Sequence, residues 1–168
     1  MTAEQKFIYL YKEMSQLCDE QNWGDPFSYA RGKEISAAII LGHRVSETLS
    51  GADAYNVKGE PLEYKSTTGK NPKGSYTGVS VQPTWKQQEE YLLKEKIAKY
   101  PEHYYNKFDT RGLEQSWMLT GEAVYNILLP KFKEKYPTVL DKKDPRLSAN
   151  INWTEIKEYG TKVYGVKE

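Results

Sequence analysis

The chain has 168 residues, 38% of them hydrophobic and 28% charged, with a formal net charge of +1. A chain of this length fits one domain, so we expect a single domain over residues 1–168. The composition is that of an ordinary soluble protein and excludes a disordered chain, and no apolar run approaches the length of a membrane span.

The sequence carries no sign of export. Its first residues lack the basic start and the apolar stretch of a secretory signal. The single cysteine, Cys18, excludes an intramolecular disulfide and any zinc site built from several cysteines. We therefore expect a cytoplasmic protein with no membrane partner.

The first half of the chain is predicted to be helical and then extended. Apolar residues at helical spacing predict an amphipathic helix over 3–20, and a second helix over 31–41 is closed by Gly42. From 44 to 68 the pattern changes to short extended pieces, with Asn56-Val57-Lys58-Gly59 as a turn between two of them.

The second half is predicted to alternate between strands and helices. We expect strands over 76–81, 104–108 and 116–119, and helices over 85–99, 122–136 and 154–159, with Thr84 and Thr154 as N-caps of the first and last of these. This order indicates an α+β fold, with a central mixed or antiparallel sheet flanked by helices.

Three ionisable residues converge in the predicted hairpin. Side chains alternate along a strand, so Glu63 and Lys65 share one face, and the turn brings Asp53 beside them. Carboxylates are the hard oxygen ligands that Mg²⁺ prefers, and the backbone carbonyl of Tyr64 could complete the set. Phosphodiester hydrolysis needs an activated water and neutralisation of developing charge, for which the Lys65 ammonium is suited.

The competing interpretation of these residues is a solvated charged hairpin, which is their commonest use. Three features favour chemistry. The spacing from Asp53 to Glu63 matches one hairpin, small residues surround Asp53, and a helix with a further acid, Glu34, comes just before it.

These segments resemble a known family. Gly32-Lys33-Glu34-Ile35 at a helix start, Gly51-Ala52-Asp53-Ala54, then Gly59 and Glu63-Tyr64-Lys65-Ser66 are similar to the core of the PD-(D/E)XK nuclease superfamily, most of all to small PvuII-like type II restriction endonucleases. The resemblance covers 31–68, and the end of the chain, 155–164, is also suggestive.

The resemblance implies a restriction-endonuclease-like core with 31–68 as its catalytic part and 69–168 as DNA-contacting and supporting elements. It implies that Asp53 and Glu63 are ligands of Mg²⁺, for which Mn²⁺ would substitute, and that Lys65 is the catalytic lysine. Glu34 matches a helix acid that reaches a metal through water. The chain departs from the pattern at Ala52, where proline is usual, and it lacks a histidine-rich DNA-reading stretch, so a target sequence cannot be transferred.

Several polar residues outside the hairpin are chemically suited to DNA. The basic, glycine-rich loop after the catalytic strand would contact phosphates, and amide and guanidinium groups further on would contact adenine and guanine edges. Loop flexibility, turn formation and helix capping are competing uses of the same residues. The DNA-contacting candidates are Lys70, Asn71, Lys73, Gln82, Arg146, Asn150 and Asn152.

Other chemistries find little support. The two histidines, His43 and His103, stand in unrelated contexts, and His103 is expected at the surface. Most of the 14 tyrosines are expected to keep their hydroxyls in water. No phosphate-binding loop or dinucleotide fingerprint is present, so no nucleotide cofactor is expected.

The leading hypothesis is a Mg²⁺-dependent, site-specific endonuclease for double-stranded DNA, prokaryotic or phage-encoded. It would act as a homodimer because one small subunit carries one active site and symmetric cutting needs two, with the helix over 3–20 as a possible contact. The alternatives are a homing nuclease, a structure-specific nuclease of junctions or repair, and a noncatalytic DNA-binding protein.

Overall fold

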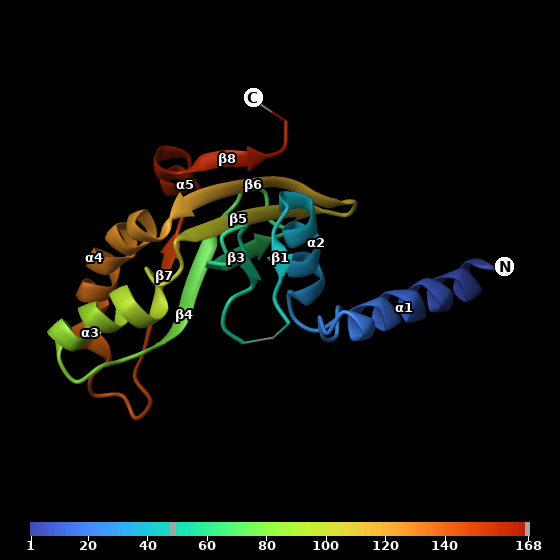
Figure 1. The fold of residues 1–168 in the computed structure, drawn as a ribbon. Helices are drawn as coiled ribbons and strands as arrows, with labels where there is room; N and C mark the ends of the chain where they lie inside the picture. The colour runs from blue at the N-terminus through green and yellow to red at the C-terminus, as the bar shows by residue number, and fades with distance from the viewer. Residues whose placement is uncertain (48–49, 167–168) are drawn as a thin grey trace.

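The computed structural model describes residues 1–47 and 50–166, and it contains a six-stranded mixed sheet with helices packed on both faces (Figure 1). This confirms the predicted α+β class. The strands are β1 (Arg44–Val45), β2 (Ala54–Tyr55), β3 (Pro61–Thr67), β4 (Gly74–Ser80), β5 (Glu102–Asp109), β6 (Gly112–Thr120), β7 (Arg146–Ile151) and β8 (Thr161–Tyr164). The helices are α1 (Ala3–Glu20), α2 (Arg31–Leu41), α3 (Trp85–Tyr91), the π-helical segment η1 (Leu92–Lys96), α4 (Gly121–Val139) and α5 (Trp153–Tyr159).

The strand order of the large sheet is β1-β2-β3-β5-β6-β8. Neighbouring strands run antiparallel except β3 and β5, which are parallel. A parallel pair needs a long crossover. Here the crossover contains β4, α3 and η1. Strand β4 is not part of the large sheet; it pairs with β7 as a separate antiparallel ribbon.

Each face of the large sheet has its own core. On one face, α2 and the end of α1 pack with Leu62, Tyr64 and Tyr104. On the other face, α3, α4 and α5 pack with the β4–β7 ribbon around Tyr105. The alternation along β5, where Tyr104 and Tyr105 enter different cores, shows that both faces are covered.

Helix α1 extends away from the body of the molecule (Figure 1). It begins with a complete capping box between Thr2 and Gln5. Of its residues only Cys18 is buried, whereas Phe7, Leu10 and Met14 are about half exposed or more.

Most predicted elements are found close to their predicted positions. Helices α1 and α2 have the predicted bounds, Gly42 closes α2 in the left-handed conformation, and Gly59 closes the turn from Asn56 with a positive φ of 79°. The extended stretch predicted from 44 to 68 includes 48–49, which lie outside the described residues.

Three predictions of local structure were wrong. The helix expected over 85–99 is α-helical only to Tyr91 and then widens into η1, which ends at Lys96. Strand β7 was not predicted, because its alternating residues were interpreted as turns and caps. Helix α5 is capped by Asn152 rather than Thr154, with a capping box to Glu155.

At Gly74 the backbone of β4 packs closely against a side chain of the large sheet. A Cβ atom on Gly74 would lie 2.3 Å from the Tyr105 ring, which is fully buried. We expect Gly74→Ala to lower the free energy of unfolding by about 1–3 kcal/mol, because the ring cannot move without disturbing the core. Chemical denaturation measures this change. Gly69→Ala is the control, since its Cβ would meet only the Thr67 side chain, at 3.3 Å, and an equal loss in both variants would contradict the packing argument.

Candidate active site

The turn at Asn56–Gly59 places Asp53 against β3. The Asp53 amide donates to the Leu62 carbonyl (3.0 Å), and Ala54 on β2 pairs with Leu62 on β3. The Asp53 carboxylate in turn accepts a hydrogen bond from the Tyr64 amide (2.7 Å). Because the N–H and C=O of one strand residue face the same side, the Tyr64 carbonyl also points toward Asp53, beyond the end of β2.

Alternation along β3 separates the reactive side chains from the core. Leu62 and Tyr64 are 0% and 5% exposed and enter the core beneath α2. Glu63 and Lys65 project from the opposite face, where the Lys65 ammonium lies 2.5 Å from a Glu63 carboxylate oxygen. The predicted convergence of Asp53, Glu63 and Lys65 is therefore present in the structure.

These three side chains line a cleft of about 450 Å³. One wall comes from β4, including Ser75 and Thr77. The wall opposite comes from η1 and the turn that follows it, and it contributes residues that the sequence analysis missed: Glu95, Lys96, Lys99 and Tyr100. Only the cluster of lysines could have hinted at them, because the π-helical widening that turns them toward the cleft has no local sequence signature.

The electrostatics of the cleft are dominated by paired carboxylates. Burial, followed by repulsion from Glu63, raises the pKa of Asp53 to about 7, while the Tyr64 amide partly opposes this rise. Glu34 and Lys65 have smaller effects of opposite sign on Asp53. The Lys65 ammonium therefore offsets only part of the effect that burial and Glu63 have on Asp53.

Glu34 lies behind the cleft rather than in its lining. It is close enough to raise the pKa of Asp53, and one of its oxygens is 3.4 Å from the guanidinium of Arg31. Arg31 is buried and also donates to the carbonyls of Trp23 and Ser46. Glu34 is therefore held by a fixed cation, and its role as a site acid remains a prediction.

The donor set of the cleft fits a hard divalent cation. Asp53 and Glu63 lie side by side, Glu95 lines the same cleft, and Mg²⁺ in proteins is bound by one or two carboxylates together with waters and substrate phosphates. Within the described residues no group of three or more His, Cys, Asp and Glu side chains is arranged to hold a metal. A cation held by Asp53 and Glu63 would therefore need further oxygen ligands, of which the Tyr64 carbonyl beside Asp53 is one candidate.

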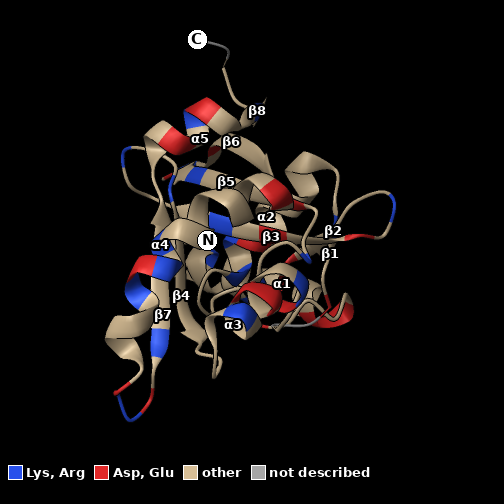
Figure 2. Cartoon of the chain, turned by 90° about the vertical axis from the view of Figure 1, so that its left-hand side faces the viewer, with Lys and Arg blue, Asp and Glu red and all other residues tan. Residues whose placement is uncertain are grey.

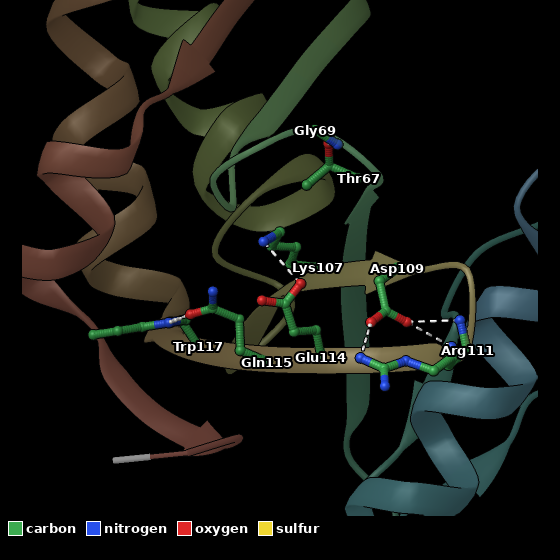
Figure 3. Close-up of polar contacts among 9 residues, drawn as sticks. Thr67, Gly69, Lys107, Asp109, Arg111, Glu114, Gln115 and Trp117 are labelled. Carbon is green, nitrogen blue, oxygen red and sulfur yellow. Dashed lines mark hydrogen bonds and ion pairs between the residues drawn. The ribbon is translucent and has the colours of Figure 1, made fainter. Parts of the chain in front are cut away.

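The loop between β3 and β4 exposes Lys70, Asn71 and Lys73. Lys70 borders a second hollow at the end of the β5–β6 hairpin, separate from the cleft. Figure 3 shows the polar contacts there: Lys107 pairs with Glu114 at 2.8 Å, and Asp109 pairs with Arg111 at 3.3 Å. The structure therefore does not bring Lys70 into the cleft.

The other DNA-contacting candidates lie on or beside the β4–β7 ribbon. Asn150 is exposed, and Arg146 is held by Asp144 (3.1 Å) and the Ser80 hydroxyl (2.8 Å). The Asn152 side-chain oxygen caps α5, and the backbone of Gln82 bonds to Gln88 and Tyr136. The side chains of Arg146 and Asn152 thus have structural roles, whereas Asn150 contributes its backbone, which pairs with Ser75 and accepts from Lys131.

The expectation of a surface position for His103 was wrong. His103 is 0% exposed and bonds to the Tyr76 hydroxyl (2.9 Å) and the Ile97 carbonyl (3.0 Å). Burial lowers the pKa of His103 to about 4. Eight of the 14 tyrosines are at least partly exposed, whereas six are buried: Tyr64, Tyr76, Tyr100, Tyr104, Tyr105 and Tyr136.

No profile of a known protein family matches this sequence, and no curated protein matches it. In the part of the chain that the structure describes, no helix is both long and apolar enough to cross a membrane.

The raised pKa of Asp53 predicts a pH-dependent stability of the metal-free protein. The carboxyl is neutral in the folded protein below about pH 7 but ionises near pH 4 when unfolded, so folding binds a proton in this range. The stabilising contribution of the neutral Asp53 carboxyl is complete below pH 4 and is lost as pH rises through 7. At pH 8 we expect Asp53→Asn to be more stable than the parent, by about 2 kcal/mol after screening by water, with the difference shrinking toward pH 4.

Thermal unfolding in chelator at a series of pH values measures this difference. Asp109→Asn is the matched control, because hydrogen bonds to the Arg111 and Gly112 amides lower the pKa of Asp109. That variant should gain nothing at pH 8. A parent and an Asp53→Asn variant with parallel pH profiles would show that Asp53 is not desolvated in this way.

Proposed function

We propose that this protein is a Mg²⁺-dependent endonuclease that hydrolyses double-stranded DNA at specific sites, with a restriction-endonuclease-like core. The observation that carries the proposal is the convergence of Asp53, Glu63 and Lys65 in one cleft. Lys96 and Lys99 stand on the opposite wall, where a polyanion would need cationic partners.

Each of the three residues has a distinct role in this proposal. Asp53 and Glu63, with the Tyr64 carbonyl, would hold the cation, and the Tyr64 amide keeps the Asp53 carboxylate oriented. The Lys65 ammonium donates one proton to Glu63 and retains two further donors, which can orient a water and stabilise negative charge on the phosphoryl group. When bound, Mg²⁺ supplies a Lewis acid and lowers the pKa of a water molecule.

Sequence recognition is assigned to the β4–β7 ribbon. A two-stranded ribbon fits the major groove of DNA. The exposed side chains Ser75 and Asn150 are directly paired across it, and Thr77 and Ser148 are exposed nearby. Asn150 is suited to the edge of adenine. The loop that joins α4 to β7, beside the ribbon, carries lysines mixed with aspartates (Figure 2).

Cleavage of plasmid DNA tests the proposal. We expect the parent protein with Mg²⁺ to nick and linearise plasmid DNA, and Asp53→Asn and Lys65→Ala to be slower by roughly 100- to 1,000-fold, because each removes charge stabilisation of the transition state. Arg111→Ala is the matched cation control. It lies at the tip of the β5–β6 hairpin with a side chain 90% exposed, and should cut at the parental rate.

The products and substrates separate the alternatives. A short palindromic cut site supports restriction, a long degenerate site a homing nuclease, and a preference for branched DNA a junction or repair nuclease. Absence of cleavage by the pure parent across diverse DNA would refute the proposed activity, whereas equal cutting by parent and variants would refute the assigned residues.

We also propose a homodimer that forms through α1. The apolar residues of α1 recur at helical spacing as one stripe, and it includes Phe7 at 67% and Met14 at 49% exposure. The stripe continues into a hollow of about 290 Å³ between α1 and α2, where Ile39 is 58% exposed. An apolar surface of this kind marks an interface, and a second copy would supply the second cleft that cutting both strands requires.

Light scattering on the intact protein tests the dimer. We expect Met14→Glu to weaken dimerisation by on the order of 100-fold, because the stripe would bury an unpaired charge. Lys12→Glu also places a carboxylate on α1, but outside both hollows that Met14 lines, and should leave the dimer intact. A monomeric parent, or a dimer that tolerates Met14→Glu, would rule out this interface.

A further inference from the structure

A buried chain of hydrogen bonds runs beneath the cleft and is not used by the chemistry described above. His103 on β5 stands directly opposite Glu63 on β3 in the parallel register. One ring nitrogen, Nε2, lies 3.0 Å from the Ile97 carbonyl, and the other, Nδ1, lies 2.9 Å from the Tyr76 hydroxyl. The Tyr76 hydroxyl is also 2.8 Å from the hydroxyl of Tyr105.

The partners determine the direction of every bond in this chain. A carbonyl oxygen can only accept, so Nε2 of His103 must carry its proton and donate to Ile97. Nδ1 of the neutral ring then accepts from the Tyr76 hydroxyl, and the Tyr76 oxygen accepts from Tyr105. His103 is therefore fixed as one tautomer, with both of its nitrogens satisfied.

One end of this series of hydrogen bonds lies at Ile97, in the wall that carries Lys96 and Lys99. The Ile97 carbonyl accepts from both His103 and the Tyr100 amide (3.2 Å), and so closes the turn between them. Gly121 secures the far side of the turn. Its amide donates to the Pro101 carbonyl (2.8 Å), and a Cβ there would lie 2.0 Å from the Tyr100 carbonyl oxygen.

The other end of the chain supports Lys65. The ammonium of Lys65 lies 4.7 Å from the centre of the Tyr76 ring, a cation–π contact. The hydroxyl of the same ring donates to His103. A single buried imidazole is thus linked both to the ring beneath the proposed catalytic lysine and to the turn on the facing wall.

We propose that His103 is a positioning residue, which holds Lys65 through Tyr76 and the Lys96–Tyr100 wall through the Ile97 carbonyl at the separation that cleavage requires. This inference rests on the proposed nuclease function. Residues that orient the groups around a metal site affect activity by roughly 10- to 100-fold when they are changed.

Two substitutions divide the roles of the imidazole. Glutamine can place its amide near Nε2 and keep the bond to Ile97, whereas asparagine reaches only as far as Nδ1 and loses that bond. We expect His103→Asn to lower the single-turnover cleavage rate by roughly 10- to 100-fold while DNA affinity, measured in Ca²⁺, stays within about threefold. His103→Gln keeps the bond to Ile97 but offers Tyr76 no acceptor at the Nδ1 position, so it should be slowed about as much as Tyr76→Phe.

Tyr104→Phe is the matched control. Tyr104 is next to His103 but faces the other side of the sheet, where its hydroxyl donates to Glu102 (2.7 Å). The variant loses this hydrogen bond and should cut at the parental rate. Tyr76→Phe keeps the ring beneath Lys65 but breaks the chain, and should be slowed like His103→Asn, which keeps the test decisive if that variant fails to fold. Parental rates in folded His103→Asn and Tyr76→Phe, or an equal loss in His103→Asn and Tyr104→Phe, would overturn the inference.

A measurement that needs no DNA separates this inference from the proposed function. Nitrogen-15 NMR of the parent should show His103 protonated at Nε2, and amide exchange at Tyr100 should be at least about tenfold faster in His103→Asn than in His103→Gln. A His103 protonated at Nδ1, or unchanged exchange at Tyr100, would overturn the inference even if the protein cuts DNA. Inactive parent protein with the expected NMR result would instead refute the nuclease proposal and leave His103 as the residue that fixes the wall.

Discussion

The parallel pairing of β3 with β5 is the constraint on which the rest of the structure depends. It sets Glu63 beside His103 and Lys65 beside Tyr105 on one face of the sheet. Parallel strands cannot be joined by a tight turn, so the chain must leave the sheet between them and return. That excursion supplies β4 on one side of the reactive residues and the η1 wall on the other. The cleft is therefore a consequence of how the two strands are connected.

The sequence predicted the parts of this arrangement that depend on near neighbours. Period-two alternation correctly separated Leu62 and Tyr64 from Glu63 and Lys65, and the turn at Asn56–Gly59 correctly brought Asp53 to them. Thr84 marked the start of α3 because its capping box is complete within four residues. In each case the deciding contacts lie within one turn or one hairpin, where residue type and spacing carry the information.

Two of the failures have a different cause. Strand β7 forms because it can pair with β4, where Gly74 meets Ile151, and the residues of β7 do not identify that partner. His103 is buried because Tyr76 and Ile97 contact it from the crossover. Long-range contacts decided both outcomes, so residue propensity alone could not predict them. The cap of α5 differs, because the capping box between Asn152 and Glu155 is local and the sequence contained that signal.

Two features of the fold are unfavourable in the isolated chain, and the proposed metal and the proposed dimer would each relieve one of them. Burial, followed by repulsion from Glu63, raises the pKa of Asp53 to about 7, a cost that the proposed divalent cation would remove. The apolar stripe on α1 remains in water, a cost that a second copy would remove. Arg31 lies between these two places. Its guanidinium donates to the carbonyls of Trp23, which follows α1, and of Ser46, and it also bonds to Glu34 behind the cleft. Binding at either place would thus stabilise an arrangement that is already built, rather than create a new one.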